Sequence, residues 1–360
     1  MKYRMSRILP SRTLPAVAGT ETIDLNVAEP ISRIDLRYKV TKSLPYMTAH
    51  PAADIIKIEL VDGSDVLFAL SGYECQALCI YDRRCPTMVH GQHMPALSEE
   101  SAYGIDFGRF LWDPELAFMP ARFRNPQLRI TYNSRLCDTG ATVPTLEVFA
   151  HIFDERQISP QGFLLSKEHY KASCPALDSH TYVDLPNDFP VRQLLVRGFH
   201  TGHEVWDSVK SVRLDEENEK RVPFDWDTEE YHRLMKGVWS QVQEQFIVWP
   251  MSDDQSYYIT PSAYYNVVAG AANDVAKPLT VTAYNTGGVV QIVNCNNSVV
   301  SALAMGSLPN HTIQFPFGDP NDLTSWYDIQ KLGSARLRVT GGESGVSGAF
   351  QVVLQQLRSY

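Results

Sequence analysis

The chain has 360 residues, and because single hydrophobic cores stop growing at roughly 250 to 300 residues, its length predicts two domains. Its formal net charge of -9 argues against a body that binds nucleic acid, which needs clustered Lys and Arg to neutralise phosphates. No apolar run approaches the roughly 20 residues that a bilayer-spanning helix needs, so a helical membrane protein is excluded.

Residues 1–20 are predicted to form a basic arm outside the fold. The segment holds no Asp or Glu, and two prolines interrupt the apolar core that a signal peptide would need. Its cations are Lys2, Arg4, Arg7 and Arg12. We expect this arm alone to contact polyanions or anionic lipid, since the rest of the chain is acidic overall.

Most regular segments of the chain are predicted to be strands. In residues 31–40, apolar side chains alternate with charged ones, which is the period of a half-buried strand. Further strands are predicted at 56–60, 66–70, 125–132, 146–152, 191–199, 209–214, 245–249, 276–283, 289–293, 335–339 and 350–357. Short strands between clusters of Gly, Pro, Asn and Asp are typical of antiparallel β-sandwiches and barrels, so the predicted fold class is all-β.

One strand plan recurs along the chain in the same order. The paired segments are 31–40 with 191–199, 56–60 with 209–214, and 125–132 with 276–283. The repeat is much longer than the units of solenoid proteins, so it predicts two copies of one β domain. The polar stretch 166–181 is predicted to link them, which places the first domain at 21–180 and the second at 181–360.

One helix is predicted among the strands, over residues 227–245. Asp227 or Thr228 can cap its start, and the two glutamates that follow suit the positive end of the helix dipole. Apolar residues recur at helical spacing at Tyr231, Leu234, Met235, Val238, Val242 and Phe246. A weaker helix is predicted at 97–112, in the corresponding region of the first copy.

The tripeptide Asp138-Thr139-Gly140 has the pattern of an aspartic protease. Such a site needs two carboxylates that share a proton, and no second Asp-Thr/Ser-Gly occurs in the chain. Because Asp, Thr and Gly are also common turn formers, we interpret the tripeptide as a turn between two strands. The sequence also lacks a serine-nucleophile elbow, a phosphate loop and a dinucleotide fingerprint, so no catalytic residue and no enzyme activity are predicted.

Two histidine pairs are candidate metal ligands. His90 and His93 precede Glu99 and Glu100, and His200 and His203 precede Glu204. A His-x-x-His spacing points the two rings of a strand apart, whereas β-barrel metalloenzymes commonly use His-x-His. The acidic segments 215–219 and 253–254 lack the spacing of a calcium loop and are interpreted as hairpin tips. No metal and no cofactor is therefore expected.

The whole-chain plan resembles that of double jelly-roll major capsid proteins from tailless icosahedral viruses with an internal membrane, the group typified by tectiviruses and corticoviruses. Residues 31–40 after a basic arm, residues 55–60 with an Asp-Gly turn, and the Asn125-Pro126-x-Leu-x-Ile segment carry the resemblance. The second copy begins near 184–196. The resemblance implies two consecutive jelly rolls, which are antiparallel β-sandwiches, with one or two short flanking helices.

A structural virion protein is the function that this resemblance implies. Three chains with two jelly rolls each would form a homotrimer, the pseudo-hexagonal capsomer, and trimers would tile an icosahedral shell. The implied partners are neighbouring capsomers, penton and minor capsid proteins, and internal membrane lipid reached through Lys2, Arg4, Arg7 and Arg12. The protein would be made in the host cytoplasm, as for a bacteriophage, and would reside in the virion without binding nucleic acid sequence-specifically.

Two other classes stay open. A tandem β-sandwich that binds or processes carbohydrate would use exposed aromatic faces beside carboxylates, with Trp112-Asp113 and Trp226-Asp227 as its first candidates. A metal-dependent tandem-barrel enzyme would use the histidine pairs. A bound glycan would identify the first class, and metal analysis of the purified chain would identify the second.

Overall fold

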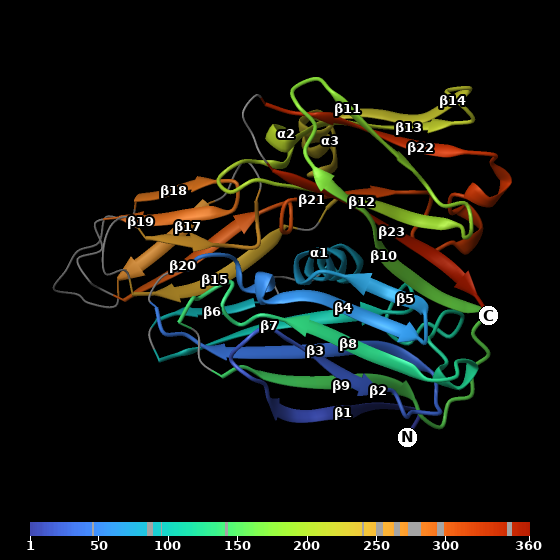
Figure 1. Cartoon of the computed structure of the whole chain (residues 1–360), viewed down its shortest axis with the longest axis horizontal. Coiled ribbons are helices and arrows are strands. Elements are labelled where there is room, and N and C mark those ends of the chain that lie inside the picture. Colours follow the sequence, from blue (N-terminus) through green and yellow to red (C-terminus); the bar gives the residue numbers. More distant parts are fainter. Residues whose placement is uncertain are drawn as a thin grey trace.

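The computed structural model describes most of the chain (Figure 1). The described residues are 1–44, 47–84, 89–94, 96–140, 143–239, 241–249, 255–262, 267–272, 282–293, 299–343 and 348–360. Strands dominate them, which confirms the predicted all-β class. Within these ranges, no helix is long and apolar enough to cross a membrane.

The first half of the chain forms a sandwich of two sheets, called here the first sandwich. One sheet orders β1 (Tyr3–Thr13), β9 (Thr145–Phe153), β3 (Ile31–Thr41) and β7 (Ser98–Asp106). The other orders β2 (Gly19–Asp24), β8 (Pro126–Tyr132), β4 (Ile55–Asp62) and β5 (Asp65–Leu70). Alternate side chains of both sheets, such as Ile34 and Leu36 on β3 and Ile58 and Leu60 on β4, meet in one buried core.

The second half forms a second sandwich with a core of its own. One sheet orders β10 (Gly162–Ser173), β23 (Ala349–Ser359), β12 (Val191–Phe199) and β21 (Thr312–Pro316). The other orders β11 (His180–Asp184), β22 (Ala335–Gly341), β13 (Val209–Glu216) and β14 (Arg221–Asp227). Leu194 and Val196 on β12 pack with Val212 and Leu214 on β13 between the sheets.

The two sandwiches repeat one topology strand by strand. In sheet position and chain order, β1 to β5 correspond to β10 to β14, and β7 to β9 correspond to β21 to β23. A β-bulge recurs as well, because β3 shifts register against β9 between Ile31 and Arg33, and β12 shifts against β23 between Val191 and Gln193. The predicted duplication of one β domain is therefore confirmed.

Two of the three segment pairs predicted from the sequence are equivalent strands. They are 31–40 with 191–199, on β3 and β12, and 56–60 with 209–214, on β4 and β13. The third pair is wrong, because the counterpart of β8 is β22 and not 276–283. Residues 276–281 lie outside the described residues. Any half-buried strand shows the same alternation, so the pattern alone cannot select the right partner.

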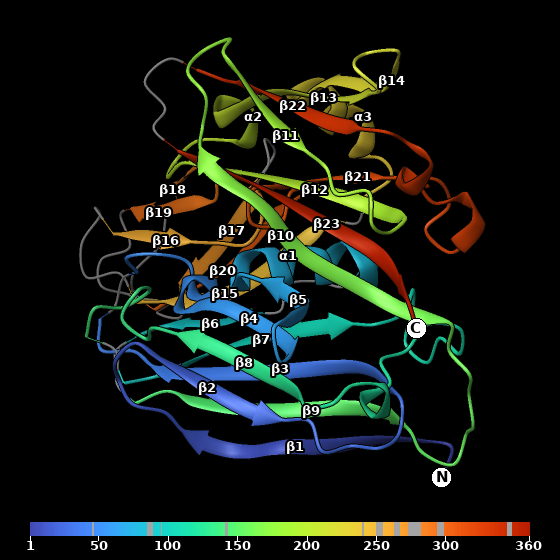
Figure 2. The same cartoon turned by 45° about the vertical axis from the view of Figure 1, so that its right-hand side comes forward.

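Two parallel strand pairs join the sandwiches. β5 pairs with β10, with Phe68 opposite Ser166 and Ala69 opposite Lys167, so one sheet runs through both halves. β6 (Val89–His93) pairs with β15 (Val242–Val248), which continues the other sheet of the first sandwich through β20 (Val300–Gly306) to β17 (Val267–Ala272). A small sheet of β16 (Ser256–Tyr258), β19 (Val289–Val293) and β18 (Thr282–Thr286) packs on this extension (Figure 2).

The basic arm and the linker predicted from the sequence are largely strands. β1 pairs with β9 over Tyr3–Thr13, so the prediction that residues 1–20 lie outside the fold is wrong. β10 pairs with the C-terminal strand β23, so much of the predicted linker 166–181 belongs to the second sandwich. Both are the first strand of a sandwich, and both are rich in polar residues, because backbone pairing does not require apolar side chains on a solvent-facing side. The domain limits 21–180 and 181–360 stay predictions.

The predicted helix exists but is shorter than its apolar period implies. α3 spans Thr228–Met235, and the Asp227 side chain caps it by accepting hydrogen bonds from two backbone N–H groups. Val242 and Phe246 continue the helical period, yet both lie on β15 and pair with β20. Ladder hydrogen bonds and the apolar core on the sheet outweigh local helical spacing here.

The other helix was predicted in the wrong place. Residues 97–112 contain β7, which pairs with β3. The first sandwich instead carries α1 (Gly72–Arg83) directly after β5, as α3 follows β14. Shorter helical turns are α2 (Val205–Ser208), η1 (Pro51–Asp54), η2 (Pro120–Arg122), η3 (Leu323–Ser325) and η4 (Ile329–Lys331).

Candidate functional site

Asp138 is buried and braces a neighbouring loop. Its carboxylate accepts hydrogen bonds from the N–H groups of Ser43 (2.7 Å), Leu44 (3.1 Å) and Gly140 (2.9 Å), and from the Ser43 hydroxyl (3.1 Å). These donors occupy the oxygens that a protease carboxylate would need for substrate and water. The tripeptide is thus a turn held to the loop after β3, as the sequence interpretation states.

Glu99, a candidate metal ligand, is engaged in a buried ion pair. Its carboxylate lies 2.7 Å from the Lys42 ammonium and 3.5 Å from His93 Nδ1, with all three side chains buried. Burial alone would raise the pKa of Glu99, but Lys42 and His93 outweigh it and lower the pKa to about 2. Lys42 therefore supplies to Glu99 the positive charge that a metal ion would otherwise bring.

The remaining members of the first metal set are dispersed. Glu100 points to the surface, where the Arg37 guanidinium donates to both of its oxygens at 2.7 and 3.0 Å. The side chain of His90 lies outside the described residues. Across the described ranges, no group of three or more His, Cys, Asp or Glu side chains converges on one point.

The second histidine pair lies at the turn before α2. The rings of His200 and His203 are 4.7 Å apart, and His203 Nδ1 lies 3.5 Å from the Asp207 carboxylate. Glu204 stands at the N-cap of α2, where burial raises its pKa to about 8. A carboxyl that is protonated at neutral pH is a poor metal ligand. We therefore interpret this cluster as the capped start of α2 and not as a metal site.

The acidic segment 215–219 is a hairpin tip, as interpreted from its sequence. It joins β13 to β14, and Glu217, Asn218 and Glu219 adopt the left-handed backbone conformation of a tight turn. Its carboxylates pair with neighbouring cations, such as Asp215 with Arg213 at 2.5 Å. The segment 253–254 lies outside the described residues.

Neither tryptophan candidate combines an open ring with a free carboxylate. Trp112 packs against Tyr3, with ring centroids 4.5 Å apart, and Asp113 is buried against the Arg109 guanidinium at 2.7 Å. Trp226 packs against Tyr231, and the carboxylate that follows it caps α3. Both positions have structural partners in place of a sugar.

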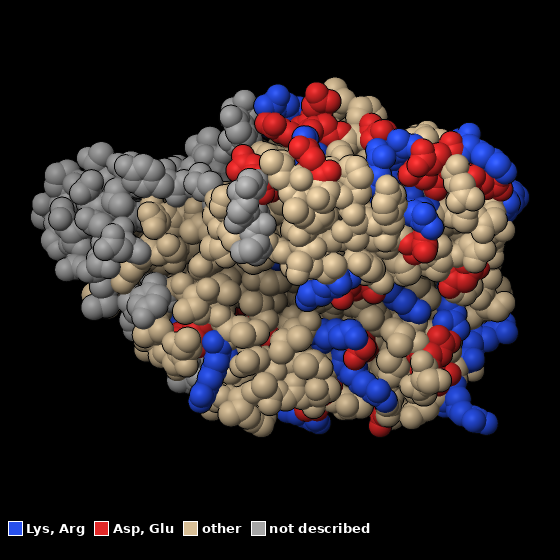
Figure 3. Space-filling view, turned by 45° about the horizontal axis from the view of Figure 1, so that its top comes forward, with Lys and Arg blue, Asp and Glu red and all other residues tan. Residues whose placement is uncertain are grey.

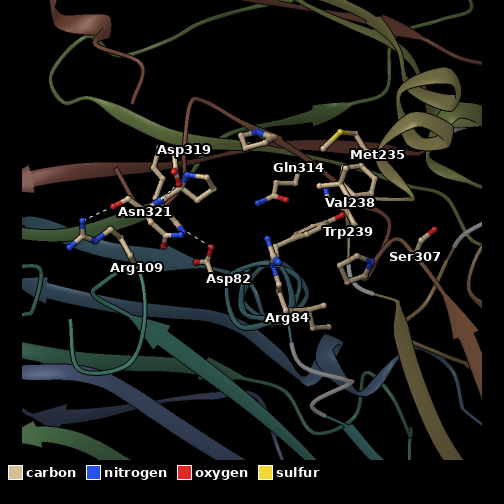
Figure 4. A pocket seen from close by; sticks show the side chains of 16 residues that line it. Asp82, Arg84, Arg109, Met235, Val238, Trp239, Ser307, Gln314, Asp319 and Asn321 are labelled. Atoms are coloured by element: carbon tan, nitrogen blue, oxygen red, sulfur yellow. Dashed lines mark hydrogen bonds and ion pairs between the residues drawn. The ribbon is translucent and has the colours of Figure 1, made fainter. Parts of the chain in front are cut away.

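A cavity of about 340 Å³ lies at the seam between the two sandwiches (Figure 4). α1 and the segment around Arg109 form one wall, while β12, α3 and the loop after β21 form the other. Figure 4 shows Asp82 and Arg84 across from Gln314, with Met235, Val238 and Trp239 at one end. The cavity therefore combines an apolar end with a charged end.

Charged groups at the cavity tie the sandwiches together. Arg192 on β12 donates to the Asp82 carboxylate at 2.7 Å, and the amides of Gln193 and Gln355 donate to the same carboxylate at 2.9 and 3.0 Å. Arg109 in the first sandwich donates to the Asn321 carbonyl oxygen at 2.7 Å. Because Asp82 and Arg192 are only 5% exposed, this network stabilises one relative placement of the two halves.

A second buried arginine reinforces the same seam. The Arg197 guanidinium stacks over Tyr73 of α1 at 4.3 Å and over Phe199 at 4.7 Å, and it donates to Gln351 at 2.7 Å. Burial lowers the pKa of Arg197. Sequence analysis missed these ties, although arginines inside the apolar strand 191–199 were a signal, because a strand buried on both faces rarely holds charge without a partner.

Solved structures match almost the whole chain, among them the following three. The STIV MCP has a TM-score of 0.60 at 10% identity, covering 99% of this chain and 96% of that chain. PBCV-1 VP54 has a TM-score of 0.57 at 10% identity, and the match covers 99% of this chain and 93% of that one. The major capsid protein P2 from bacteriophage PM2 has a TM-score of 0.55 at 10% identity, and the match covers 99% of this chain and 98% of that one. The chain has the double jelly-roll fold. No protein-family model and no curated protein sequence matches it.

The jelly-roll expectation is therefore confirmed for both halves. Each sandwich is one jelly roll. The internal repeat of that fold is the correspondence of β1–β5 with β10–β14 and of β7–β9 with β21–β23. At about 10% identity the likeness resides in topology and not in shared residues. The function has to be inferred from the surfaces of the protein, because the candidate motif residues, such as Asp138 and Glu99, take part in turns and ion pairs.

Proposed function

We propose that the protein is a major capsid protein, three copies of which form a pseudo-hexagonal capsomer of an icosahedral shell. The observation that carries the proposal is the duplicated jelly roll, which solved capsid proteins match over 99% of the chain. Two similar jelly rolls in one chain give a trimer six similar building blocks, which can fill a hexagonal tile. The virion is the location that follows.

The interior of the fold supports a structural role over an enzymatic one. Asp138, Glu99 and Asp82 each hold backbone or cationic partners, and such pairs rigidify a fold without leaving reactive groups free. The alternative of a tandem sandwich that binds or processes carbohydrate loses its main support, since Trp112 and Trp226 pack on neighbouring rings.

The finer partners remain part of the proposal. They are neighbouring capsomers, penton and minor capsid proteins, and internal membrane lipid near Lys2, Arg4, Arg7 and Arg12. Attraction of cations to an anionic lipid surface contributes roughly 1 kcal/mol per residue. Because these cations lie on or beside an edge strand, lipid would meet an ordered strand and not a loose tail. Synthesis in the host cytoplasm and a bacteriophage origin stay predictions.

Native mass tests the proposal directly. Light scattering of the purified chain is expected to give a mass of three times 40.5 kDa. Negative-stain images of the same peak are expected to show six-cornered particles. A chain that stays monomeric at every concentration, without higher assemblies, would overturn the capsid reading and favour glycan and metal screens.

A further inference from the structure

The chain contains one contact between its sandwiches that can be extended to a contact between copies. Inside the chain, the fifth strand of the first sandwich, β5, pairs in parallel with the first strand of the second, β10. The equivalent fifth strand of the second sandwich is β14, and the equivalent first strand of the first sandwich is β1. Both β1 and β14 stand at sheet edges, where no described strand pairs with their outer sides.

Matching bulges fix which residues of β1 and β10 are equivalent. β1 shifts register against β9 between Arg7 and Leu9, and β10 shifts against β23 between Glu168 and Tyr170. Arg7 and Glu168, the last residues before the two bulges, are therefore equivalent. The residues before them match in turn, so Ser6 is the counterpart of Lys167 and Met5 that of Ser166. The match rests on strand pairing and not on sequence similarity.

The same count applies to β5 and β14. In the first sandwich Leu60 lies opposite Phe68, and in the second Leu214 lies opposite Phe224. Phe68 and Phe224 therefore occupy equivalent positions. One residue further along, Asp225 is the counterpart of Ala69, and Trp226 is the counterpart of Leu70.

Side chains at the β5–β10 junction inside the chain are buried, whereas their counterparts on the unpaired edges β1 and β14 are exposed. At the seam inside the chain, Ser166 and Leu70 are 1% and 0% exposed. Their counterparts Met5 and Trp226 are 63% and 36% exposed. Met5 and one face of Trp226 thus stay in solvent at positions equivalent to a buried seam, although Trp226 also packs against Tyr231. Apolar surface left open in this way indicates a surface covered in the assembly.

The chemistry of the two edges is complementary. Placing β1 beside β14 in the register of the internal pair sets Met5 opposite Phe224, Ser6 opposite Asp225 and Arg7 opposite Trp226. These are a sulfur–aromatic contact and a cation–π contact on one face. Arg4, on the same face as Ser6, then lies diagonally across from Asp225. Both have only loose partners in their own chain, Arg4 with Glu29 and Asp154 at 3.4 Å and Asp225 with two arginines at 3.8 and 3.9 Å.

The two edges lie at opposite ends of the molecule. Figures 1 and 2 place β1 at the bottom and β14 at the top, with the other strands of both sandwiches between them. Figure 3 shows side chains of both charge signs gathered near the end that carries β13 and β14, beside a wide uncharged area. A contact between different surfaces of identical copies is heterologous, and it closes into a ring when the rotation allows.

We propose that β1 of one copy pairs in parallel with β14 of the next copy, in the register of the β5–β10 pair. The proposal rests on the capsid function proposed above and names the surfaces that hold the capsomer together. It places Arg4 and Arg7 against the neighbouring copy, so Lys2 and Arg12 are the two cations that stay available to lipid. The ring then alternates an internal β5–β10 junction with an intermolecular β14–β1 junction. Each jelly roll has an equivalent neighbour on either side.

Cysteine cross-linking tests the register. In the variant carrying Ser6→Cys and Asp225→Cys, mild oxidation is expected to give a ladder of two and three linked chains on a gel, which a reducing agent removes. The matched control combines Ser6→Cys with Val222→Cys, which lies on the same strand three residues out of register. No ladder is expected from the control, from either single variant or from the unsubstituted chain.

Light scattering of the same samples separates the two levels of the proposal. If the chain is trimeric but the in-register pair forms no ladder beyond the control, the β1–β14 contact is overturned while the capsid function stands. If the chain is monomeric throughout, both are overturned. If the chain is trimeric, and the in-register variant gives the ladder while the control does not, the β1–β14 contact is established.

Discussion

The buried pair of Asp82 and Arg192 shows how single charges hold the two jelly rolls together. Removing one partner of a buried ion pair costs about 3–5 kcal/mol, because the other charge stays in a poorly solvated site. Asp82→Ala is therefore expected to lower the free energy of unfolding by about that amount in a urea titration. The two side chains are equally buried, so Arg192→Ala should behave alike.

An exposed pair supplies the control for this experiment. Lys331 contacts Asp328 at 2.6 Å, but the lysine side chain is 80% exposed. Lys331→Ala should therefore cost less than about 1 kcal/mol, since surface pairs contribute little. Equal losses in the Asp82 and Lys331 variants would refute a special role for the seam.

Because the pKa of Glu244 is raised, its contribution to folding stability should fall as the pH rises, whereas that of an ordinary ion-paired carboxyl increases. It is fully buried and accepts the Thr260 N–H at 2.6 Å, and burial raises its pKa from 4.5 to about 7. Above pH 4.5 the unfolded chain releases this proton while the folded chain keeps it, so stability falls from about pH 4.5 to 7 and is flat above.

Glu244→Gln removes that titration and keeps an oxygen for Thr260. The variant should be more stable than the parent chain at pH 8 and no more stable at pH 4, as measured by thermal unfolding across the range. Glu100→Gln is the comparison, because Glu100 lies at the surface beside Arg37. A Glu244→Gln variant that gains nothing at pH 8 would count against the raised pKa.

At the scale of elements, the sequence predicts strands better where one face is buried. Apart from its bulged start, β3 buries every second side chain, and its sequence alternation predicts it correctly. The polar side chains of β1 and much of β10 instead predict an arm and a linker. Their backbone partners, β9 and β23, lie more than a hundred residues away. A pattern of side chains records burial and not pairing, so polar edge strands escape it.

Helix α1 is not predicted from the sequence for a related reason. Its capping box of Ser71 and Glu74 was visible as Ser-x-x-Glu, yet its buried face includes Glu74 and Gln76 beside Cys75 and Leu78. A helix that packs within the fold at the seam buries polar groups as well, so its apolar period is weak. The candidate site at this seam was therefore out of reach of motif reasoning.

Deleting β1 tests whether the first residues are a strand or an arm. Removal of residues 1–13 exposes the edge of β9 and takes Leu9 out of the core, where loss of a leucine side chain alone costs about 2–5 kcal/mol. The truncated chain should unfold at a clearly lower temperature and fail to form trimers. Lys2→Ser removes a cation but keeps the strand, so its unfolding temperature should match that of the parent chain. An unchanged midpoint after the deletion would argue that β1 contributes no pairing.

At the scale of the whole molecule, internal duplication links fold to assembly. The sequence revealed the repeat through β3 and β12, but only the sheet order shows that β1 and β14 are the unused equivalents of a used junction. A fold built from two equivalent halves meets its own neighbours with surfaces that already match inside one chain. Charge at those edges then decides how tightly the copies hold.

Charge reversal at the two edges tests this last step. Asp225→Lys places a cation near Arg4 of the next copy, and Arg4→Glu places an anion near Asp225. Each contact is worth roughly 0.2–1 kcal/mol, and a ring of three copies repeats it three times, so either variant should dissociate at a higher protein concentration than the parent trimer. Combining both changes restores opposite charges across the contact and should recover part of the lost association. Recovery stays incomplete because each change also puts like charges together within its own chain, at Glu29 and Asp154 or at Arg213 and Arg338. Asp225→Asn, which removes charge without reversing it, should lie between. Sedimentation velocity over a dilution series measures all four, and a double variant weaker than both single ones would place Arg4 and Asp225 in different contacts.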